Sequence, residues 1–321
     1  MQMNELQENW LEGKIDKKLY WTLMRENFTR VLPQIQLILK KSDECHEIKI
    51  TKDGCILVKS NGLQLFFDFN QSICRAETDL LMKEDYEKKE MDYISNYLKE
   101  KKCLNVLDIG ANVGLFSLEL YLENSDITYH LFEPIPTTFD MMKKTAKLNN
   151  VNNNLFIMNN MGMSNEKGKF DFYLPGACEA ASLQPIDDTF YLKESDAMGN
   201  YSGKSVIRKV ECEVNTIDNY IKSNNIEDIG FIKIDVEGNE KSVLFGAEKT
   251  LSKYHPMVYC ELLRKHASRF GYHPNEVIDY MKKFDYNCYI LRNNELTQIN
   301  KINDETKETN FFFITEGIRQ N

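Results

Sequence analysis

From residue 105 onward, short apolar segments alternate with longer segments whose apolar residues recur every three or four positions. The first pattern is typical of buried strands and the second of amphipathic helices. The expected strands are 105–109, 127–132, 154–159, 169–174, 206–214, 230–235, 257–262, 286–291 and 309–315. The expected helices are 114–123, 136–149, 216–224, 240–252 and 274–283. This alternation predicts an α/β fold with a doubly wound, mainly parallel sheet.

Two segments depart from the alternation. Only polar residues separate the last two expected strands, 286–291 and 309–315, which predicts an antiparallel hairpin at one edge of the sheet. Residues 175–205 hold few aliphatic side chains but contain Gly176, Gly199, Gly203, Tyr191 and Tyr201. A loop this long inside a compact domain is usually functional or disordered, and we expect a substrate lid here.

The first 77 residues follow a different pattern. Residues 16–40 have helical apolar spacing, which Pro33 is expected to interrupt. Three strand-like segments follow at 46–51, 55–59 and 63–69, the first two joined by a hairpin turn signal. We expect residues 1–77 to form a small accessory module of helix and β-hairpin. The main domain, 78–321, then begins with a charged helix over 78–100.

Composition excludes several classes of protein. The chain has 321 residues, with 40 basic and 49 acidic side chains and a net charge of −9, so a nucleic-acid partner is not expected. Its 8 cysteines include no Cys-x-x-Cys pair, which argues against zinc and disulfide frameworks and predicts reduced thiols such as Cys260 and Cys288. The polar amino terminus does not resemble a signal peptide, and no apolar segment approaches the roughly 20 residues that cross a bilayer. We expect a cytoplasmic protein without stable membrane insertion.

The most informative segment is Asn105-Val-Leu-Asp-Ile-Gly-Ala-Asn-Val-Gly114. A strand that runs into an acidic residue and a glycine-rich turn predicts a nucleotide pocket at the carboxyl end of that strand. Gly110 and Gly114 permit the sharp turn and a close approach to a ligand. The spacing differs from Gly-x-Gly-x-x-Gly, and Asp108 suits an ammonium group better than two phosphates. The turn therefore indicates a nucleoside pocket for a partly cationic ligand.

The next two strand ends extend this pocket. Glu133 and Pro134 end the second strand, about 20 positions after the glycine turn, where an acidic residue accepts hydrogen bonds from a ribose diol. The alternative role for Glu133 is to cap the following helix. Asn160 and Met161 end the third strand and are expected to contact a flat base, although asparagine is also common in turns.

Charged residues mark the ends of two further strands. Lys233, Asp235 and Glu237 share one face of a buried strand, where charges are costly unless they pair or serve a site. An internal Lys233–Asp235 ion pair is the alternative. Glu261 ends the neighbouring strand and is expected to face the same cleft. His266 is a candidate general base, the alternative being a solvated loop histidine.

Taken in order, these motifs resemble the FkbM family of methyltransferases. The resemblance rests on Glu87 in the helix before the domain, Val-Leu-Asp-Ile-Gly-Ala-Asn-Val-Gly, Phe-Glu-Pro, Lys-Ile-Asp-Val-Glu-Gly-Asn-Glu and Cys-Glu-Leu, and it covers roughly residues 80–292. It implies a seven-stranded, Rossmann-like sheet that binds S-adenosylmethionine, and the terminal hairpin agrees with this architecture. The implied contacts are Asp108, Gly110, Ala111, Asn112 and Gly114 with the methionine portion, Glu133 and Pro134 near the ribose, and Asn160 with Met161 at the adenine.

The resemblance also implies methyl transfer, often to a hydroxyl group of a sugar or polyketide-type product. We expect O-methylation of a small molecule or carbohydrate, with Asp235 and Glu237 as the first catalytic candidates, then Glu261, then His266 and Lys233. Asp235 and Glu237 would accept the acceptor's proton, orient its hydroxyl, or hold a divalent metal, and the residues leave these roles open. A nicotinamide-dependent oxidoreductase and a non-catalytic methyltransferase-like binding protein are the alternatives.

Overall fold

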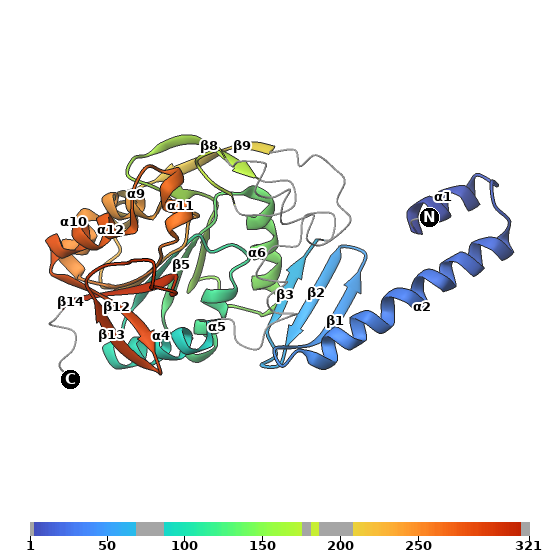
Figure 1. Cartoon of the computed structure of the whole chain (residues 1–321), viewed down its shortest axis with the longest axis horizontal. Helices are drawn as coiled ribbons and strands as arrows, with labels where there is room; N and C mark the ends of the chain where they lie inside the picture. The colour runs from blue at the N-terminus through green and yellow to red at the C-terminus, as the bar shows by residue number, and fades with distance from the viewer. Residues whose placement is uncertain (1–2, 69–86, 175–180, 186–207, 316–321) are drawn as a thin grey trace.

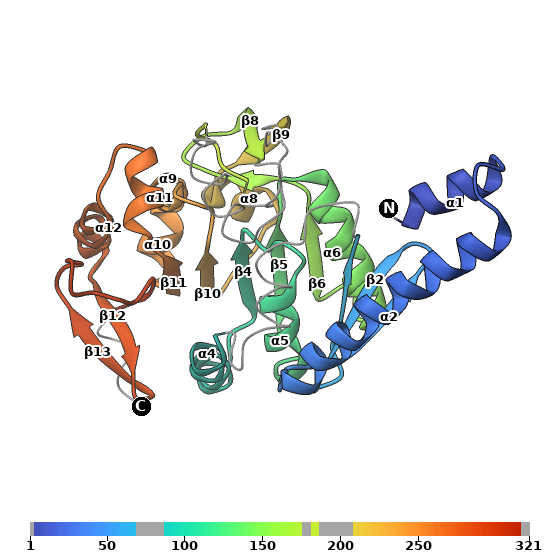
Figure 2. The ribbon, with the colours of Figure 1, turned by 45° about the vertical axis from the view of Figure 1, so that its right-hand side comes forward.

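The computed structural model describes residues 3–68, 87–174, 181–185 and 208–315. Its centre is a sheet with the strand order β13-β12-β14-β11-β10-β4-β5-β6 (Figures 1 and 2). The strands of this sheet are β4 (Asn105–Ile109), β5 (Thr128–Phe132), β6 (Phe156–Asn159), β10 (Ile229–Ile234), β11 (Met257–Glu261), β12 (Tyr286–Arg292), β13 (Glu295–Ile299) and β14 (Asn310–Thr315). The five strands from β11 to β6 are parallel, whereas β14 pairs antiparallel with both β11 and β12. The predicted mainly parallel sheet and its antiparallel edge are confirmed.

Helices cover both faces of this sheet, because successive strand residues point to opposite sides. Val106 and Phe231 face one apolar cluster, and their neighbours Leu107 and Ile232 face the other. The first face packs against α4 (Lys88–Lys101), α5 (Leu115–Glu123) and α6 (Pro136–Leu148). The second packs against α8 (Ile217–Ser223), α9 (Glu240–Phe245), α10 (Glu248–Tyr254), α11 (Arg264–Arg269) and α12 (Pro274–Met281). The fold is therefore doubly wound, as predicted.

The sheet has eight strands, one more than the resemblance implied. The additional strand is β13, which the sequence suggested to be a polar loop. Asn293 and Asn294 adopt φ values of 51° and 64°, the left-handed conformation that tight hairpin turns require, and the following residues pair with β12. Because β13 is an edge strand with a largely exposed face, its residues lack the apolar alternation that marks buried strands.

Two expected strands form a separate sheet. The segments predicted at 169–174 and 206–214 are β8 (Gly168–Leu174) and β9 (Arg208–Asn215), which pair with each other and not with the main sheet. The short strand β7 (Gly162–Met163) joins them on the other side of β9. Apolar alternation predicted these strands correctly, but it contains no information about which sheet a strand joins.

The amino-terminal part consists of α1 (Met3–Leu11), α2 (Lys17–Lys41) and a sheet of β1 (Cys45–Thr51), β2 (Gly54–Lys59) and β3 (Gln64–Phe67). The sheet is fastened to the main domain, since the Phe66 amide donates to Thr145 Oγ1 at 3.0 Å and the Gln64 amide to Asn149 Oδ1 at 2.9 Å, both on or next to α6. In contrast, α2 projects away from the main domain (Figure 1). It also runs through Pro33. The predicted interruption is wrong because Pro33 is exposed, so water can hydrate the carbonyl that the proline leaves without a donor.

Some expectations cannot be compared with the structure or need adjustment. The boundary at 77/78 lies outside the described residues, as does most of the predicted lid at 175–205. The predicted helix 78–100 begins later than expected, at Lys88, because Glu87 before it has a left-handed backbone conformation with a φ of 47°. The predicted helix 240–252 is divided into α9 and α10 at Gly246, where a Cβ atom would lie 2.1 Å from the carbonyl oxygen of Ser164. The helix α11 was not predicted.

Candidate active site

Five parallel strands end at one edge of the sheet, and the predicted site residues lie at or just beyond these ends. Asp108 lies in β4 and the glycine turn follows it, Glu133 follows β5, and Asn160 follows β6. Lys233 lies in β10 with Asp235 and Glu237 after it, and Glu261 ends β11. His266 lies on α11 and not on a loop. The structure therefore brings the predicted residues to a common edge.

A buried lysine joins two of the predicted carboxylates. Asp108 and Lys233 are neighbours across the sheet and both are buried. The Nζ atom of Lys233 lies 3.5 Å from Asp108 Oδ1 and 3.3 Å from Asp235 Oδ2, so the internal Lys233–Asp235 ion pair is present. Asp108 also accepts a hydrogen bond from Ser117 Oγ at 2.7 Å, a contact that the sequence did not predict. These contacts offset the cost of burying the charges and fix the orientation of Asp108.

The glycine turn is pressed against the residue that follows β10. Gly110 has a φ of 80°, and a Cβ atom there would lie 1.8 Å from the carbonyl oxygen of Asp235. The amides of Gly110 and Ala111 both donate to the carbonyl of Phe132 at 3.0 Å. Gly114 also has a positive φ, of 83°, directly before α5. The turn is thus held between the ends of β5 and β10, in a conformation that other residues rarely adopt.

Glu133 links this turn to the chain that leaves β5. Its Oε2 accepts a hydrogen bond from the Asn112 amide at 3.1 Å, and its Oε1 accepts one from the Ile135 amide at 2.9 Å. Burial raises the pKa of Glu133 to about 7, although both amides oppose the shift. The bond to Ile135, directly before α6, corresponds to the capping role that the sequence left open. The carboxylate oxygens can each accept a further hydrogen bond, so the ribose role stays a prediction.

Asn160 joins the ends of β5 and β6. Its Nδ2 atom donates to the carbonyl oxygens of Glu133 at 2.9 Å and Pro134 at 3.0 Å. Met161 is half-buried and packs against the second apolar cluster. Both residues therefore have structural roles at this edge, and their contact with an adenine ring stays a prediction.

The segment after β10 supplies a histidine–carboxylate pair. Glu237 Oε2 lies 3.1 Å from His266 Nδ1, and both side chains are partly buried. Glu240 holds the intervening turn, because its Oε1 accepts hydrogen bonds from the amides of Val236 at 3.2 Å and Gly238 at 2.9 Å. The negative charge of Glu237 at this distance favours the protonated imidazole and hence uptake of a proton by His266. The partner that the sequence did not reveal for His266 is thus Glu237.

Glu261 lies among other acidic groups. Burial, followed by the negative charges of Asp235 and Glu237, raises the pKa of Glu261 to about 10. A carboxyl group with this pKa is protonated near pH 7, so it donates a hydrogen bond and does not accept a proton as a general base. Its catalytic role stays a prediction.

One further acid reaches this edge from a distant part of the chain. Asn310 in β14 is opposite Glu261 in β11, and its Nδ2 donates to Glu87 Oε1 at 2.9 Å. Glu87 precedes α4, has a φ of 47°, and its Oε2 is buried with no hydrogen-bond partner in the part of the chain that the structure describes. Burial raises the pKa of Glu87 to about 7, opposed by the charge of Lys233 and reinforced by that of Asp235. Only the family resemblance had drawn attention to Glu87, and nothing in the sequence had indicated Asn310.

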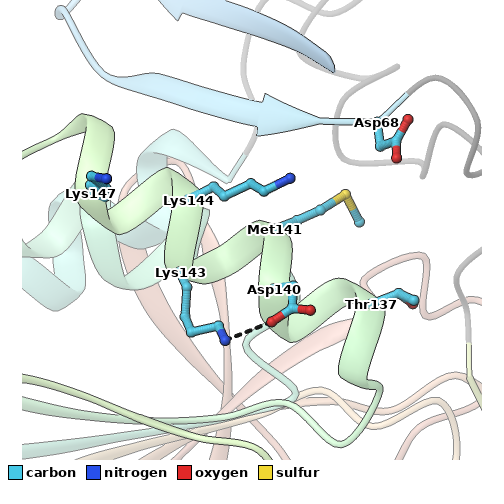
Figure 3. Close-up of a pocket in the computed structure, with 7 residues that line it drawn as sticks. All are labelled: Asp68, Thr137, Asp140, Met141, Lys143, Lys144 and Lys147. Carbon is cyan, nitrogen blue, oxygen red and sulfur yellow. Dashed lines mark ion pairs between the residues drawn. The ribbon is translucent and has the colours of Figure 1, made fainter. Parts of the chain in front are cut away.

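A separate cavity of about 370 Å³ lies between the end of β3 and α6 (Figure 3). It is lined by Asp68, Thr137, Asp140, Met141, Lys143, Lys144 and Lys147. Two of its lysines already have partners, since Lys143 pairs with Asp140 at 2.6 Å and Lys144 lies 4.1 Å from the ring centroid of Phe66. None of the predicted site residues lines this cavity. Within the described residues, no three His, Cys, Asp or Glu side chains are arranged to hold a metal ion.

The family model of the methyltransferase FkbM domain matches residues 108–288, which include the glycine turn, the Lys233–Glu240 segment and Glu261. The chain belongs to the FkbM methyltransferase family. The resemblance noted from the motifs is thereby confirmed, and it favours a methyltransferase over a nicotinamide-dependent oxidoreductase.

Two curated proteins are similar to part of this chain. The 31-O-demethyl-FK506 methyltransferase FkbM of Streptomyces tacrolimicus is 31% identical over 157 residues, which are 44% of this chain and 59% of that protein. Methyltransferase 1 of Beauveria bassiana is 26% identical over 176 residues, 50% of this chain and 69% of that protein. The chain thus spans about three fifths of the length of the first of these relatives.

Among solved structures, an FkbM methyltransferase from Methylobacillus flagellatus is similar at 15% identity, with a TM-score of 0.40, over 66% of this chain and 43% of that chain.

Proposed function

We propose that this FkbM-family protein is an S-adenosylmethionine-dependent methyltransferase that modifies an oxygen atom of a small molecule or carbohydrate. The observation that carries the proposal is the acidic surplus around Lys233. This lysine contacts Asp108 and Asp235 directly, and its charge also acts on Glu87, Glu133 and Glu261. Even with Glu261 protonated, the carboxyl groups of Asp108 and Asp235 outnumber this single lysine, which favours a ligand that carries positive charge.

S-adenosylmethionine fits this environment because it carries an ammonium and a sulfonium group. The buried Oε2 of Glu87, which has no hydrogen-bond partner among the described residues, is of the right kind to accept a hydrogen bond from an ammonium group. Asp108 and the glycine turn would hold the methionine portion with it, and Glu133 the ribose. Asn160 and Met161 would lie at the adenine. The bound cofactor supplies an electrophilic methyl group for an in-line displacement.

The residues at and beyond the ends of β10 and β11 deprotonate and position the acceptor hydroxyl. His266, oriented by Glu237, accepts the proton of the acceptor hydroxyl as the oxygen becomes nucleophilic. Asp235 orients that hydroxyl while Lys233 holds the carboxylate in place. Glu261, protonated near pH 7, donates a hydrogen bond to the acceptor. In this proposal His266 is the general base, and the other residues at the sheet edge position the acceptor.

Two measurements test the proposal. Calorimetry should show S-adenosylmethionine binding that is weakened in Asp108→Ala and Glu133→Ala, and unchanged affinity in both variants would contradict the pocket assignment. A screen of labelled methyl transfer to hydroxylated metabolites and glycan precursors should identify an acceptor, and Asp235→Asn should lower its turnover while S-adenosylmethionine affinity is kept. Tight cofactor binding without transfer to any acceptor would favour the non-catalytic binding protein.

We also propose that the protein is cytoplasmic. The support comes from six buried free cysteines, Cys45, Cys55, Cys103, Cys212, Cys260 and Cys288, because reduced thiols in a core are usual in a reducing compartment. Fractionation of cells that express a tagged chain tests this placement.

A further inference from the structure

The long helix α2 carries an apolar stripe that the rest of the described chain leaves largely uncovered. Trp21, Met24, Phe28, Val31 and Ile35 follow one another at alternating steps of three and four residues, so they share one face of the helix. Trp21 is 56% exposed, Phe28 45% and Val31 39%. Leu32, beside this stripe, is 51% exposed. Exposed apolar residues scattered singly are ordinary, but a continuous row of this kind marks a binding surface.

Contacts within the described chain occupy only the ends of α2. Near its start, Tyr20 is buried and stacks on Trp10 of α1 with ring centroids 4.7 Å apart. Near its end, Leu39 packs against the first apolar cluster. Between these contacts the helix extends away from the main domain (Figure 1).

The helix α2 also carries an excess of positive charge. The helix contains Lys17, Lys18, Arg25, Arg30, Lys40 and Lys41, against a single acidic residue, Glu26. None of these six basic residues forms an ion pair with another described residue. The whole chain has a net charge of −9, so α2 is a positive segment on a negative protein. A helix of this charge favours a negatively charged partner.

We propose that α2 binds the surface of an anionic phospholipid bilayer, with its apolar stripe in the interface and its basic residues at the headgroups. A helix with an exposed row of Trp, Phe and aliphatic residues, an excess of Lys and Arg and little net hydrophobicity is the type that lies in the plane of a membrane surface. Anionic headgroups attract each basic residue. A second copy of the chain is a poorer occupant, because pairing two α2 helices would bring twelve basic side chains together against two acidic ones.

This mode of binding differs from crossing the bilayer. No helix in the described ranges combines the length and the apolar character that a membrane span requires. Because α2 projects from the main domain, the acidic remainder of the chain is kept away from the negative surface. The proposal is independent of methyl transfer, since it concerns no residue of the candidate active site.

Vesicle binding by the full chain tests the proposal. The protein should sediment with vesicles of phosphatidylcholine and phosphatidylglycerol. Its binding should be about tenfold weaker with vesicles of phosphatidylcholine alone, or with the mixed vesicles at about 0.5 M salt. The chain has only 2 tryptophans, Trp10 and Trp21. In a Trp10→Phe variant, fluorescence therefore reports on Trp21 alone, and its emission should shift to shorter wavelength when anionic vesicles are added.

Paired variants separate the two halves of the proposal. The first test pair, Phe28→Gln with Val31→Gln, removes apolar contacts of the stripe. Its control pair, Thr22→Gln with Thr29→Gln, introduces two glutamines on the other side of the helix. The second test pair, Arg25→Gln with Arg30→Gln, removes two positive charges from α2. Its control pair, Lys52→Gln with Lys167→Gln, removes two exposed positive charges outside α2. We expect each test pair to lower binding about tenfold and each control pair to leave it unchanged, with circular dichroism showing that the fold is kept.

Three results would overturn the proposal. The first is equal or absent sedimentation with both kinds of vesicle, and the second is an unchanged Trp21 emission. The third is a dimer in solution that becomes monomeric in the Phe28→Gln, Val31→Gln variant, because a second copy of the chain would then cover the stripe.

Discussion

The Nδ1 atom of His266 lies 3.1 Å from Oε2 of Glu237, which joins the segment after β10 to the short helix after β11. Neither residue lies in a strand, so their meeting depends on two turns of defined shape. Glu237 has a φ of 57°, and at Gly238 a Cβ atom would lie 2.6 Å from the carbonyl oxygen of His266. The glycine at position 238 therefore lets the segment after β10 approach α11 closely enough for Glu237 to reach His266.

If His266 is the general base, His266→Gln should lower kcat by about 10²–10⁴-fold while leaving S-adenosylmethionine affinity within about twofold. Glu237→Gln should have a smaller effect, because the imidazole remains and loses only its orienting partner. His46→Gln, at an exposed position on β1, is the matched control. Steady-state kinetics with the identified acceptor checks this prediction, and a His266 variant with normal kcat would remove the residue from the mechanism.

The close packing at Gly110 should make it intolerant of any side chain. Gly110→Ala would place a methyl group 1.8 Å from the Asp235 carbonyl oxygen, so the glycine turn or the end of β10 must move. We expect a loss of about 3 kcal/mol or more in the free energy of unfolding, together with loss of cofactor binding. Gly62→Ala is the control, since Gly62 also has a positive φ, of 90°, but no atom within 4 Å of the added Cβ. Both variants introduce backbone strain, but only Gly110→Ala introduces steric overlap. Urea denaturation of the two variants measures the difference, and equal losses of unfolding free energy would show that the overlap is unimportant.

Glu240 should make stability depend on pH near neutrality. Burial raises its folded-state pKa from 4.5 to about 7, so the native protein binds this proton more tightly than the unfolded chain. The resulting stabilisation is complete below about pH 4.5 and is lost as the pH rises through about 7. Glu240→Gln should flatten that decline, whereas Glu248→Gln, on the neighbouring α10, should not. Thermal unfolding from pH 5 to pH 8 checks the difference in slope, and parallel curves for the parent and Glu240→Gln would contradict it.

Glu87 should contribute to cofactor binding although it lies outside the main sheet. Glu87→Gln keeps the size of the side chain and an oxygen for Asn310, but it removes the charge offered to an ammonium group. We expect S-adenosylmethionine affinity to fall about tenfold, within the range for a hydrogen bond to a charged group. Glu90→Gln, in the first turn of α4, is the control, and calorimetry with both variants provides the test. An unchanged affinity in Glu87→Gln would assign the residue a purely structural role.

The sequence predicted the strand ends better than the contacts between them. Asp108, Glu133, Lys233 and Glu261 could be located because buried strands have a clear apolar pattern and parallel strands end together. The Glu237–His266 pair and the Asn310–Glu87 hydrogen bond could not, since each depends on how turns and a distant antiparallel strand are placed. Pro33 was misjudged for another physical reason. The free-energy cost of a proline within a helix depends on whether water can hydrate the carbonyl that loses its donor. The apolar pattern of the sequence around Pro33 does not reveal this.

The position of β14 has a consequence for the order in which the protein can fold during synthesis. This strand lies between β11 and β12, although it is the last strand along the described chain. Until residues 310–315 leave the ribosome, β11 remains an open edge with unpaired backbone groups, which is a hazard for misassociation. Asn310 also reaches Glu87 across a separation of 223 residues. The acidic edge of the sheet is therefore completed late, after nearly all of the described chain has been made.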